Sequence, residues 1–184
     1  MNIRMTHTRR LWLAALCCLL VAVAASLPAQ AQTTQRIPGT KVSYTFPSRW
    51  KYLSTTDVDD STQIYLFTYR ERPVHADGDT TLPFLRIYVR KFYTKPLTDL
   101  VFTRYMQQPY QSLEEYLTGP GLPAKGGMGY IGAYTHTKNH KDYQFRMVYF
   151  KEGNTAVEFR LETTRATYPQ MEEEFLSILK SMKF

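Results

Sequence analysis

Two histidines and an aspartate in the second half of the chain have the residue types of a metal site. His136 and His140 stand four positions apart, Asp142 follows them, and His75 is the other histidine beyond residue 31. This spacing would join both imidazoles on a helix, but here it straddles a predicted hairpin turn, and a zinc site needs three or four ligands. Exposed turn histidines are therefore expected and no metal ligand is assigned; a metal-assisted hydrolase using His136 and His140 remains the alternative function.

Glu158 and Glu162 are the candidate pair of carboxylates for acid–base hydrolysis. On a predicted strand they share a face about 13 Å apart, which exceeds the roughly 5–9.5 Å that separates the carboxyl groups of glycosidases. We expect instead a solvated ladder of charges that pairs these acids across strands with Arg146 and Arg160. The sequence therefore assigns no catalytic residue.

The segment 127–132, Gly-Met-Gly-Tyr-Ile-Gly, matches the glycine spacing of a dinucleotide-binding loop. That chemistry requires the glycines between a strand and a helix, so that helix amides meet the pyrophosphate. Here a loop rich in glycine and proline precedes the glycines and a strand-like segment follows them. We expect a loop that enters a strand, and we assign no cofactor.

Two features are candidates for a binding surface. Arg86, Tyr88 and Arg90 form a stripe on one face of a predicted strand, where an anionic or sugar ligand could bind. A solvated face, or one covered by the helix that follows, is the other interpretation of this stripe. Trp50 either anchors a partner at the surface or packs on the end of the sheet.

The strands that must position these side chains follow from alternating polarity and from β-branched and aromatic content. They are predicted at 41–46, 62–70, 84–93, 130–138, 142–151 and 155–165. A turn is expected at 57–61, and the loops 71–83 and 119–129 are rich in proline, glycine or aspartate.

Three helical segments are predicted between and after these strands. The first follows Pro96 and is interrupted by Pro109. The second covers 112–117, because Ser112 and Glu115 have the spacing of a capping box. The last begins at Pro169 and runs to about residue 180.

The hairpin at 152–154 allows its register to be predicted. A three-residue loop would set Tyr149 opposite Val157 and Met147 opposite Phe159, which collects the apolar side chains on one face. A one-residue slip would invert the whole set. We therefore expect the three-residue loop, with Asn154 in the positive-φ conformation that it requires.

The N-terminus has the layout of a secretory signal peptide over residues 1–31. Three arginines precede an apolar run of fifteen residues, 11–25, and small residues stand at Ala29 and Ala31. A membrane-spanning helix needs roughly 20 residues, so we expect cleavage after Ala31 and no stable membrane span afterwards. A flexible leader over 32–40 and a single domain over 41–184 would follow.

Composition limits the cellular compartments and the classes of partner that are expected for this chain. Both cysteines lie within the expected signal peptide, so the remainder has no thiol or disulfide chemistry and must be stabilised by its apolar core alone. The remaining 20 basic and 16 acidic residues give a net charge of +4, without the clustered basic stripe that nucleic-acid binding requires. We expect an exported protein, periplasmic or extracellular, that binds no nucleic acid.

Both ends of the domain resemble the Mog1/PsbP-like superfamily. The residues that carry the likeness are Tyr44-Thr45-Phe46-Pro47-Ser48-Arg49-Trp50 and the segment 175–184, Phe-Leu-Ser-Ile-Leu-Lys-Ser-Met-Lys-Phe. The resemblance implies an α/β/α sandwich around an antiparallel sheet. It carries no functional residue over to this chain.

The order of the predicted elements agrees with that fold class: α+β, with an antiparallel sheet of about six strands and helices packed on it. Because no motif for an activated nucleophile, acid pair or metal cluster is complete, the sequence favours a non-catalytic exported domain. Its partner would be an unknown protein or envelope component, or a small ligand, with the loops 71–83 and 119–129 as contact surface. A structural subunit of an envelope assembly differs from this only in the size of the partner.

Overall fold

The computed structural model describes residues 33–71, 80–116 and 129–184. The expected signal peptide and most of the two expected contact loops lie outside the described residues. By its internal contacts, the segment Gln32–Phe184 is one unit. The elements described are β1 Thr33–Arg36, β2 Ser43–Phe46, β3 Trp50–Asp57, β4 Thr62–Tyr69, β5 Phe84–Arg90, α2 Leu97–Gln107, β6 Ser112–Tyr116, β7 Gly129–Lys138, β8 Lys141–Glu152, β9 Thr155–Thr164 and α3 Tyr168–Lys180.

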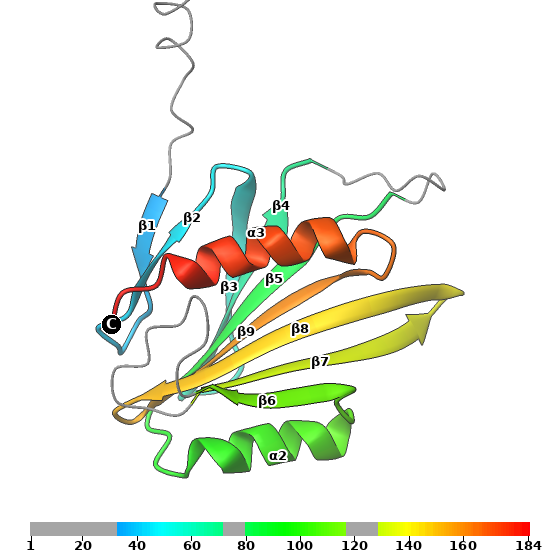
Figure 1. Ribbon diagram of the computed structural model, residues 1–184. Coiled ribbons are helices and arrows are strands. Elements are labelled where there is room, and N and C mark those ends of the chain that lie inside the picture. The colour runs from blue at the N-terminus through cyan, green and yellow to red at the C-terminus, as the bar shows by residue number, and fades with distance from the viewer. Residues whose placement is uncertain (1–32, 72–79, 117–128) are drawn as a thin grey trace, which may run out of the picture. The chain divides into compact units, whose positions relative to one another are not determined.

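An antiparallel sheet is the centre of this unit. Among the described residues it has seven strands in the order β3-β4-β5-β9-β8-β7-β6, and β1 and β2 form a separate two-stranded sheet (Figure 1). The α+β class and the antiparallel sheet expected from the sequence are confirmed. The sheet has a strand at each edge that was not predicted, β3 and β6, while the predicted strand at 41–46 became β2 of the small sheet.

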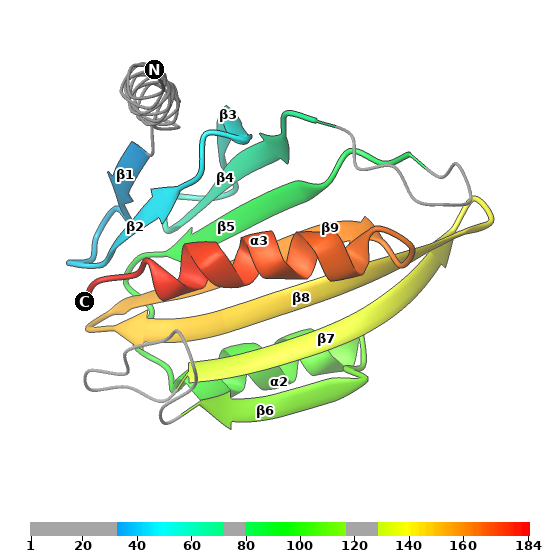
Figure 2. The same ribbon diagram turned by 45° about the horizontal axis from the view of Figure 1, so that its top comes forward.

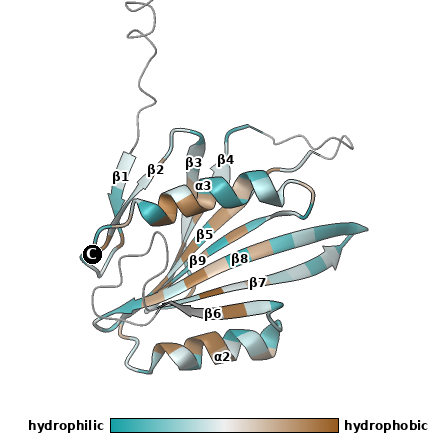
Figure 3. Ribbon diagram, viewed as in Figure 1, coloured by the Kyte–Doolittle hydropathy of each residue, from teal (hydrophilic) through white to brown (hydrophobic). Residues whose placement is uncertain are grey.

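The two helices cover opposite faces of the sheet. Figure 2 shows α3 in front of the strands and α2 behind them. Helix α3 buries Met171, Phe175, Ile178 and Leu179 against odd-numbered residues of β5 and β9, such as Ile87 and Phe159. Helix α2 buries Leu97, Leu100 and Val101 against the other face. Apolar residues therefore occur on both faces of the sheet. Figure 3 shows hydrophobic segments along the central strands and on both helices.

Residues 33–40, expected to be a flexible leader, form part of the fold. β1 pairs with β2 from Thr33 opposite Phe46 to Arg36 opposite Ser43. Ile37 then enters the core with 1% of its surface exposed, and the Thr40 hydroxyl donates to its carbonyl at 2.9 Å. This segment is polar and has no alternating pattern, so its sequence did not predict a strand. Backbone pairing with β2 and the buried side chain of Ile37 stabilise it instead.

Residues 112–116, expected to be helical, form the edge strand β6. Its backbone pairs with β7 from Ser112 opposite Ala133 to Tyr116 opposite Gly129. The helix that the spacing of Ser112 and Glu115 predicted is therefore replaced by a strand. An isolated helix this short is marginal in water, and the unpaired backbone groups of β7 provide a partner that no local pattern reveals.

The register of the β8–β9 hairpin is shifted by one residue from the predicted register. Phe150 lies opposite Val157 and Tyr149 opposite Glu158, so the loop is the two-residue Gly153-Asn154. Gly153, not Asn154, takes the positive φ, at 54°, as the first central position of a type II′ turn does. The prediction was wrong because it assumed one apolar face, whereas α2 and α3 cover both faces and place Tyr149 and Phe159 on opposite sides.

Candidate functional site

A buried carboxylate lies at the centre of the face that α2 covers. Glu158 of β9 has no exposed surface. Its Oε1 accepts hydrogen bonds from Nε of Arg160 at 2.9 Å and from Nη2 of the same residue. Its Oε2 accepts from Nη2 of Arg90 at 3.2 Å and from Nε of Arg104 at 3.3 Å. Four charge-assisted donors therefore hold this side chain in one position.

The three arginines come from three different elements. Arg90 ends β5 and Arg160 lies on β9, and both point to the α2 face because of the two-residue period of a strand. Arg104 lies on α2 at the position seven residues after Leu97, on the helix face that also carries Leu100 and Val101. Packing of that apolar face on the sheet therefore brings the third guanidinium to Glu158.

Tyr88 lies in the middle of these guanidiniums. The guanidinium carbons of Arg160, Arg104 and Arg90 stand 4.8, 5.3 and 5.4 Å from the centroid of its ring. At these distances each cation is attracted to the ring electrostatically. The aromatic ring thus fills the space between three like charges. We call Tyr88, Arg90, Arg104, Glu158 and Arg160 the arginine cluster.

Charges in the arginine cluster control the ionisation of Glu158. Burial by itself opposes ionisation, but the positive charges of Arg160, Arg104 and Arg90 hold the pKa of Glu158 below its ordinary value. The same carboxylate raises the pKa of the Arg160 guanidinium against the effect of burial. Glu158 is therefore ionised at neutral pH, and arginine keeps its proton in proteins. Three positive charges face one negative charge among the described side chains of the cluster.

A cavity of about 190 Å³ lies beside this excess of positive charge. Arg104 and Arg160 form its charged wall. The rest of the lining is polar or aromatic: Gln107, Gln108, Tyr110, Tyr134 and Tyr149. The phenol oxygens of Tyr110 and Tyr149 are 2.8 Å apart. Burial raises the pKa of Tyr110 to about 12 and that of Tyr149 further, so both phenols are protonated at neutral pH.

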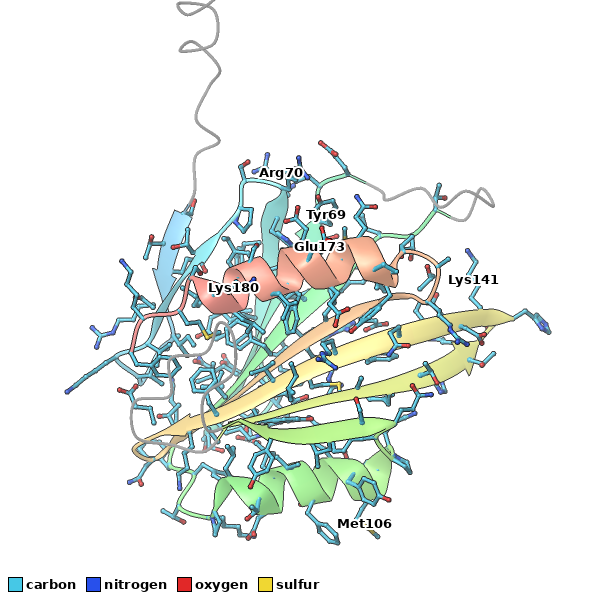
Figure 4. The ribbon with its side chains drawn as sticks, viewed as in Figure 1. Tyr69, Arg70, Met106, Lys141, Glu173 and Lys180 are labelled. Carbon is cyan, nitrogen blue, oxygen red and sulfur yellow. The ribbon has the colours of Figure 1, made fainter. Side chains whose placement is uncertain are left out.

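The outer side of α2 carries exposed apolar side chains. Phe102 and Met106 are one helical turn apart and are 63% and 68% exposed; Figure 4 labels Met106 on the side of α2 away from the sheet. Phe92, between β5 and α2, is 78% exposed and has a φ of 59°. Phe92 and Phe102 line one shallow concavity together with Arg90, Lys95 and Asp99. We call Phe92, Phe102 and Met106 the α2 surface.

The structure brings part of the predicted binding stripe together. Arg86, Tyr88 and Arg90 all lie on the face that α2 covers; Arg86 pairs with Glu162 and contacts the ring of Phe84. Trp50 is on the other side, buried in the core against Phe46 and Tyr69. The expected ladder therefore divides. Glu162 pairs with Arg86, and Arg146 faces α3, where it lies 3.6 Å from Glu172. Glu158 pairs with Arg160 of its own strand and has no exposed surface, so the prediction of a solvated cross-strand ladder was wrong for this residue.

Sequence reasoning missed Arg104. The signal was present, because Leu97, Leu100, Val101 and residue 104 have the spacing of one helix face. The same spacing from Val101 also leads to Tyr105, whose ring extends the apolar pattern and makes the arginine less noticeable. A charged residue on an apolar helix face indicates a buried counter-ion, and Glu158 is that counter-ion.

The candidate metal ligands are exposed on the β7–β8 hairpin. His136 lies opposite Tyr143, and His140 is in the two-residue turn after Asn139. Asp142 accepts a hydrogen bond from the Thr137 hydroxyl at 2.6 Å. In residues 33–71, 80–116 and 129–184, no three His, Cys, Asp or Glu side chains group as metal ligands.

The glycine motif continues into a strand. Residues 127 and 128 lie outside the described residues, and 129–132 begin β7. The hydrogen of Gly132 faces the ring of Tyr110, and a Cβ there would come within 3.1 Å of that ring. This glycine therefore allows Tyr110 to pack closely beside the cavity.

Within the described residues, no helix combines the length and apolar composition that crossing a bilayer would require.

Comparisons with known proteins identify similar folds. No protein-family model and no curated protein sequence matches this chain. Among solved structures it is similar to LpqN of Mycobacterium tuberculosis, whose structure is described as involved in cell envelope biogenesis, with 12% identity and a TM-score of 0.51 over 83% of this chain and 90% of LpqN. It is also similar to the Ran-binding protein Mog1p of Saccharomyces cerevisiae, with 11% identity and a TM-score of 0.47 over 84% of this chain and 96% of Mog1p.

A third similar structure, from Bacteroides thetaiotaomicron, is longer. The identity is 13% and the TM-score 0.49 over 84% of this chain, which spans only 48% of that structure. The likeness to LpqN concerns the fold alone. The Mog1/PsbP-like resemblance expected from the sequence is confirmed in that sense, for the fold and not for an activity.

Proposed function

We propose that this chain is a non-catalytic accessory domain of the cell envelope, exported by the signal peptide expected over residues 1–31, that binds an acidic protein partner through the α2 surface. The observation that carries the proposal is the exposure of Phe92, Phe102 and Met106, at 78%, 63% and 68%, around one side of α2. Phenylalanine and methionine are enriched in protein interfaces. Three such side chains left in water beside a concavity are a surface for a partner.

Charge supports an acidic partner. Lys95 lines the concavity beside Phe92 and Phe102, and Nζ of Lys151 lies next to it, 2.7 Å from the Lys95 carbonyl. Among the described residues that line this concavity, Asp99 is the one acid. A partner that places apolar side chains over Phe102 and carboxylates over the two lysines would complement both features. Long-range attraction of this kind speeds association and weakens with salt.

The backbone at Phe92 supports a role beyond packing. A φ of 59° is unusual for a bulky side chain and costs about 1–3 kcal/mol. The conformation leaves the ring in solvent, so burial of the ring does not offset that cost. Glycine would avoid this strain. A functional contact made by the ring would explain why the position has phenylalanine instead.

Photo-crosslinking at single positions in living cells tests the proposal. A photoreactive residue at Phe92, Phe102 or Met106 should yield one shared adduct with a protein of low isoelectric point, and its yield should fall with ionic strength in envelope extracts. Leu53 and Val58 are the matched controls, because they are also exposed apolar residues but lie at β3. Adducts of equal yield at the control positions, or none at the three α2 positions, would contradict the proposal.

A further inference from the structure

We propose that the cavity between α2 and the sheet is a binding site for a small oxyanion, a carboxylate or a phosphate group. The cavity and the α2 surface lie on the same side of the domain, but the anion proposal does not depend on the proposed function. The evidence is independent of the α2 surface: it consists of the charges, the fixed geometry and the size of the cavity beneath α2.

The first argument is the unbalanced charge. Arg90, Arg104 and Arg160 are 14%, 25% and 16% exposed, and the single carboxylate of Glu158 balances one of them. Arginine cannot lose its proton in a protein, so the excess of two positive charges is permanent among the described side chains. Water screens such charges poorly once they are buried, and an anion in the cavity would reduce their mutual repulsion.

The second argument is that the positive wall of the cavity is already held in place. Nε of both Arg104 and Arg160 is bonded to Glu158, and the Nη1 of Arg104 donates to Oε1 of Gln107 at 3.0 Å. These bonds fix the planes of two guanidiniums whose side chains also line the cavity. Guanidinium donors in a fixed plane match the paired oxygens of a carboxylate or phosphate. Glu158 is thus a positioning residue for Arg104 and Arg160, the charged wall of the cavity.

The third argument is the remainder of the lining. Tyr134 contributes a phenol whose pKa is raised by burial, so it is neutral and can donate a hydrogen bond to an anion. The hydroxyls of Tyr110 and Tyr149 bond to each other at 2.8 Å, and that of Tyr110 donates to the Val101 carbonyl at 3.3 Å, so these two rings form a fixed, uncharged part of the lining. The described cavity lining contains no carboxylate. A volume of about 190 Å³ compares with roughly 30 Å³ for a water molecule in the liquid. It therefore fits a small anion, or the charged end of a larger ligand, with a few waters.

A purely structural role is the competing explanation, since the arginine cluster also ties α2 to the sheet. One variant separates the two. Gln107→Glu places a carboxylate where Arg104 already donates a hydrogen bond, so it keeps the contact and neutralises one excess charge. A structural cluster would tolerate this change, whereas an anion site would lose affinity. Gln170→Glu, exposed on α3 on the other face, is the matched control.

The experiment measures binding of inorganic phosphate and of acetate to the purified mature chain, by titration at constant ionic strength against chloride. We expect saturable binding of at least one anion, a rise in Tm that follows its concentration, and a loss of affinity of about tenfold or more in Gln107→Glu, with Gln170→Glu unchanged. Binding of phosphate alone, acetate alone or both tells which geometry the site accepts, and each supports the proposal.

Two results would overturn it. One is the absence of saturable binding by either anion, and the other is an equal loss of affinity in Gln107→Glu and Gln170→Glu. Neither result touches the partner proposal, because crosslinking from Phe102 does not depend on anion affinity. Conversely, the protein could bind phosphate or acetate as expected but give no crosslinks at the α2 surface. That result would contradict the partner proposal and would still support the anion site.

Discussion

Arg104 of α2 donates its Nε hydrogen to Oε2 of Glu158 on β9, at a nitrogen–oxygen distance of 3.3 Å. This bond joins a helix to the middle of the sheet through a carboxylate that has no exposed surface. The same carboxylate orients Arg160 and Arg90. Glu158 therefore connects three elements of the fold, and its removal should affect both the stability of the domain and the geometry of the cavity.

Replacing Glu158 with glutamine should lower the free energy of unfolding by about 3–5 kcal/mol, because three mostly buried guanidiniums would lose a counter-ion that is itself fully buried. Glu162→Gln is the matched control. It breaks one pair, with Arg86, in which both side chains are partly exposed, and should cost no more than about 1 kcal/mol. Urea denaturation of both variants measures the difference. Equal losses would mean that the cluster does not stabilise the fold.

The contribution of Glu158 to stability should depend on pH in the acid range. Its folded pKa is lowered, so the unfolded chain binds the proton more readily. The stabilisation is then fully present above the unfolded pKa of about 4.3 and is lost as the pH falls through the lower folded pKa. Denaturation from pH 7 to pH 2.5 should show the gap between wild type and Glu158→Gln constant above about pH 5 and narrower below it. A gap that widens with acid would contradict this.

Replacing His140 with glycine should raise the free energy of unfolding by about 0.5–1 kcal/mol. Asn139 and His140 have φ values of 51° and 60°, the type I′ turn in which Asn-Gly is the favoured pair. His136→Gly, in the adjoining strand, should instead destabilise the protein, because glycine weakens strand interiors. Thermal unfolding of the two variants gives the comparison. Destabilisation by His140→Gly would show that the imidazole makes a contact worth more than the strain.

Replacing Phe92 with glycine should separate stability from binding. Relief of the left-handed backbone should stabilise the fold by about 1 kcal/mol, whereas loss of the ring should reduce the yield of crosslinks from Phe102 to the partner. The two measurements are thermal unfolding and quantitative crosslinking. If the crosslink yield is unchanged, Phe92 is not part of the binding surface.

The mature protein should begin at Gln32. The pattern of residues 1–31 predicts cleavage after Ala31. N-terminal sequencing of the protein recovered from the extracellular or periplasmic fraction checks this directly. A recovered chain that still contains Leu11 to Ala25 would reject the signal-peptide interpretation and would require a membrane anchor in its place.

Strands and helices with a strong local period were predictable. β4, β5, β7, β8 and β9 and helices α2 and α3 lie where alternation, helical spacing and prolines indicate. Elements held by pairing with distant backbone were not: β1 is polar, β6 resembles a capped helix, and β3 has mostly exposed side chains. Edge strands of this kind are specified by the neighbour that they complete, which no short window of sequence contains.

The candidate site was predictable in part for the same reason. The alternation in β5 placed Arg86, Tyr88 and Arg90 on one face, either as a surface for an anionic or sugar ligand or as a solvated or helix-covered face. The position of Arg104 was readable from helix spacing, but its contact with Glu158 was not. Packing of α2 on this face of the sheet decided that contact.

From its local patterns, the sequence alone determined the fold class, most of the central strands and the side chains that share a strand face. Tertiary structure decided what covers each face. With α3 on one side and α2 on the other, both sides of β9 are buried, so a strand that reads as half polar holds Glu158 in the interior. The physical reason is that a charge enters a core only when partners from elsewhere in the chain compensate it, here Arg90 and Arg104.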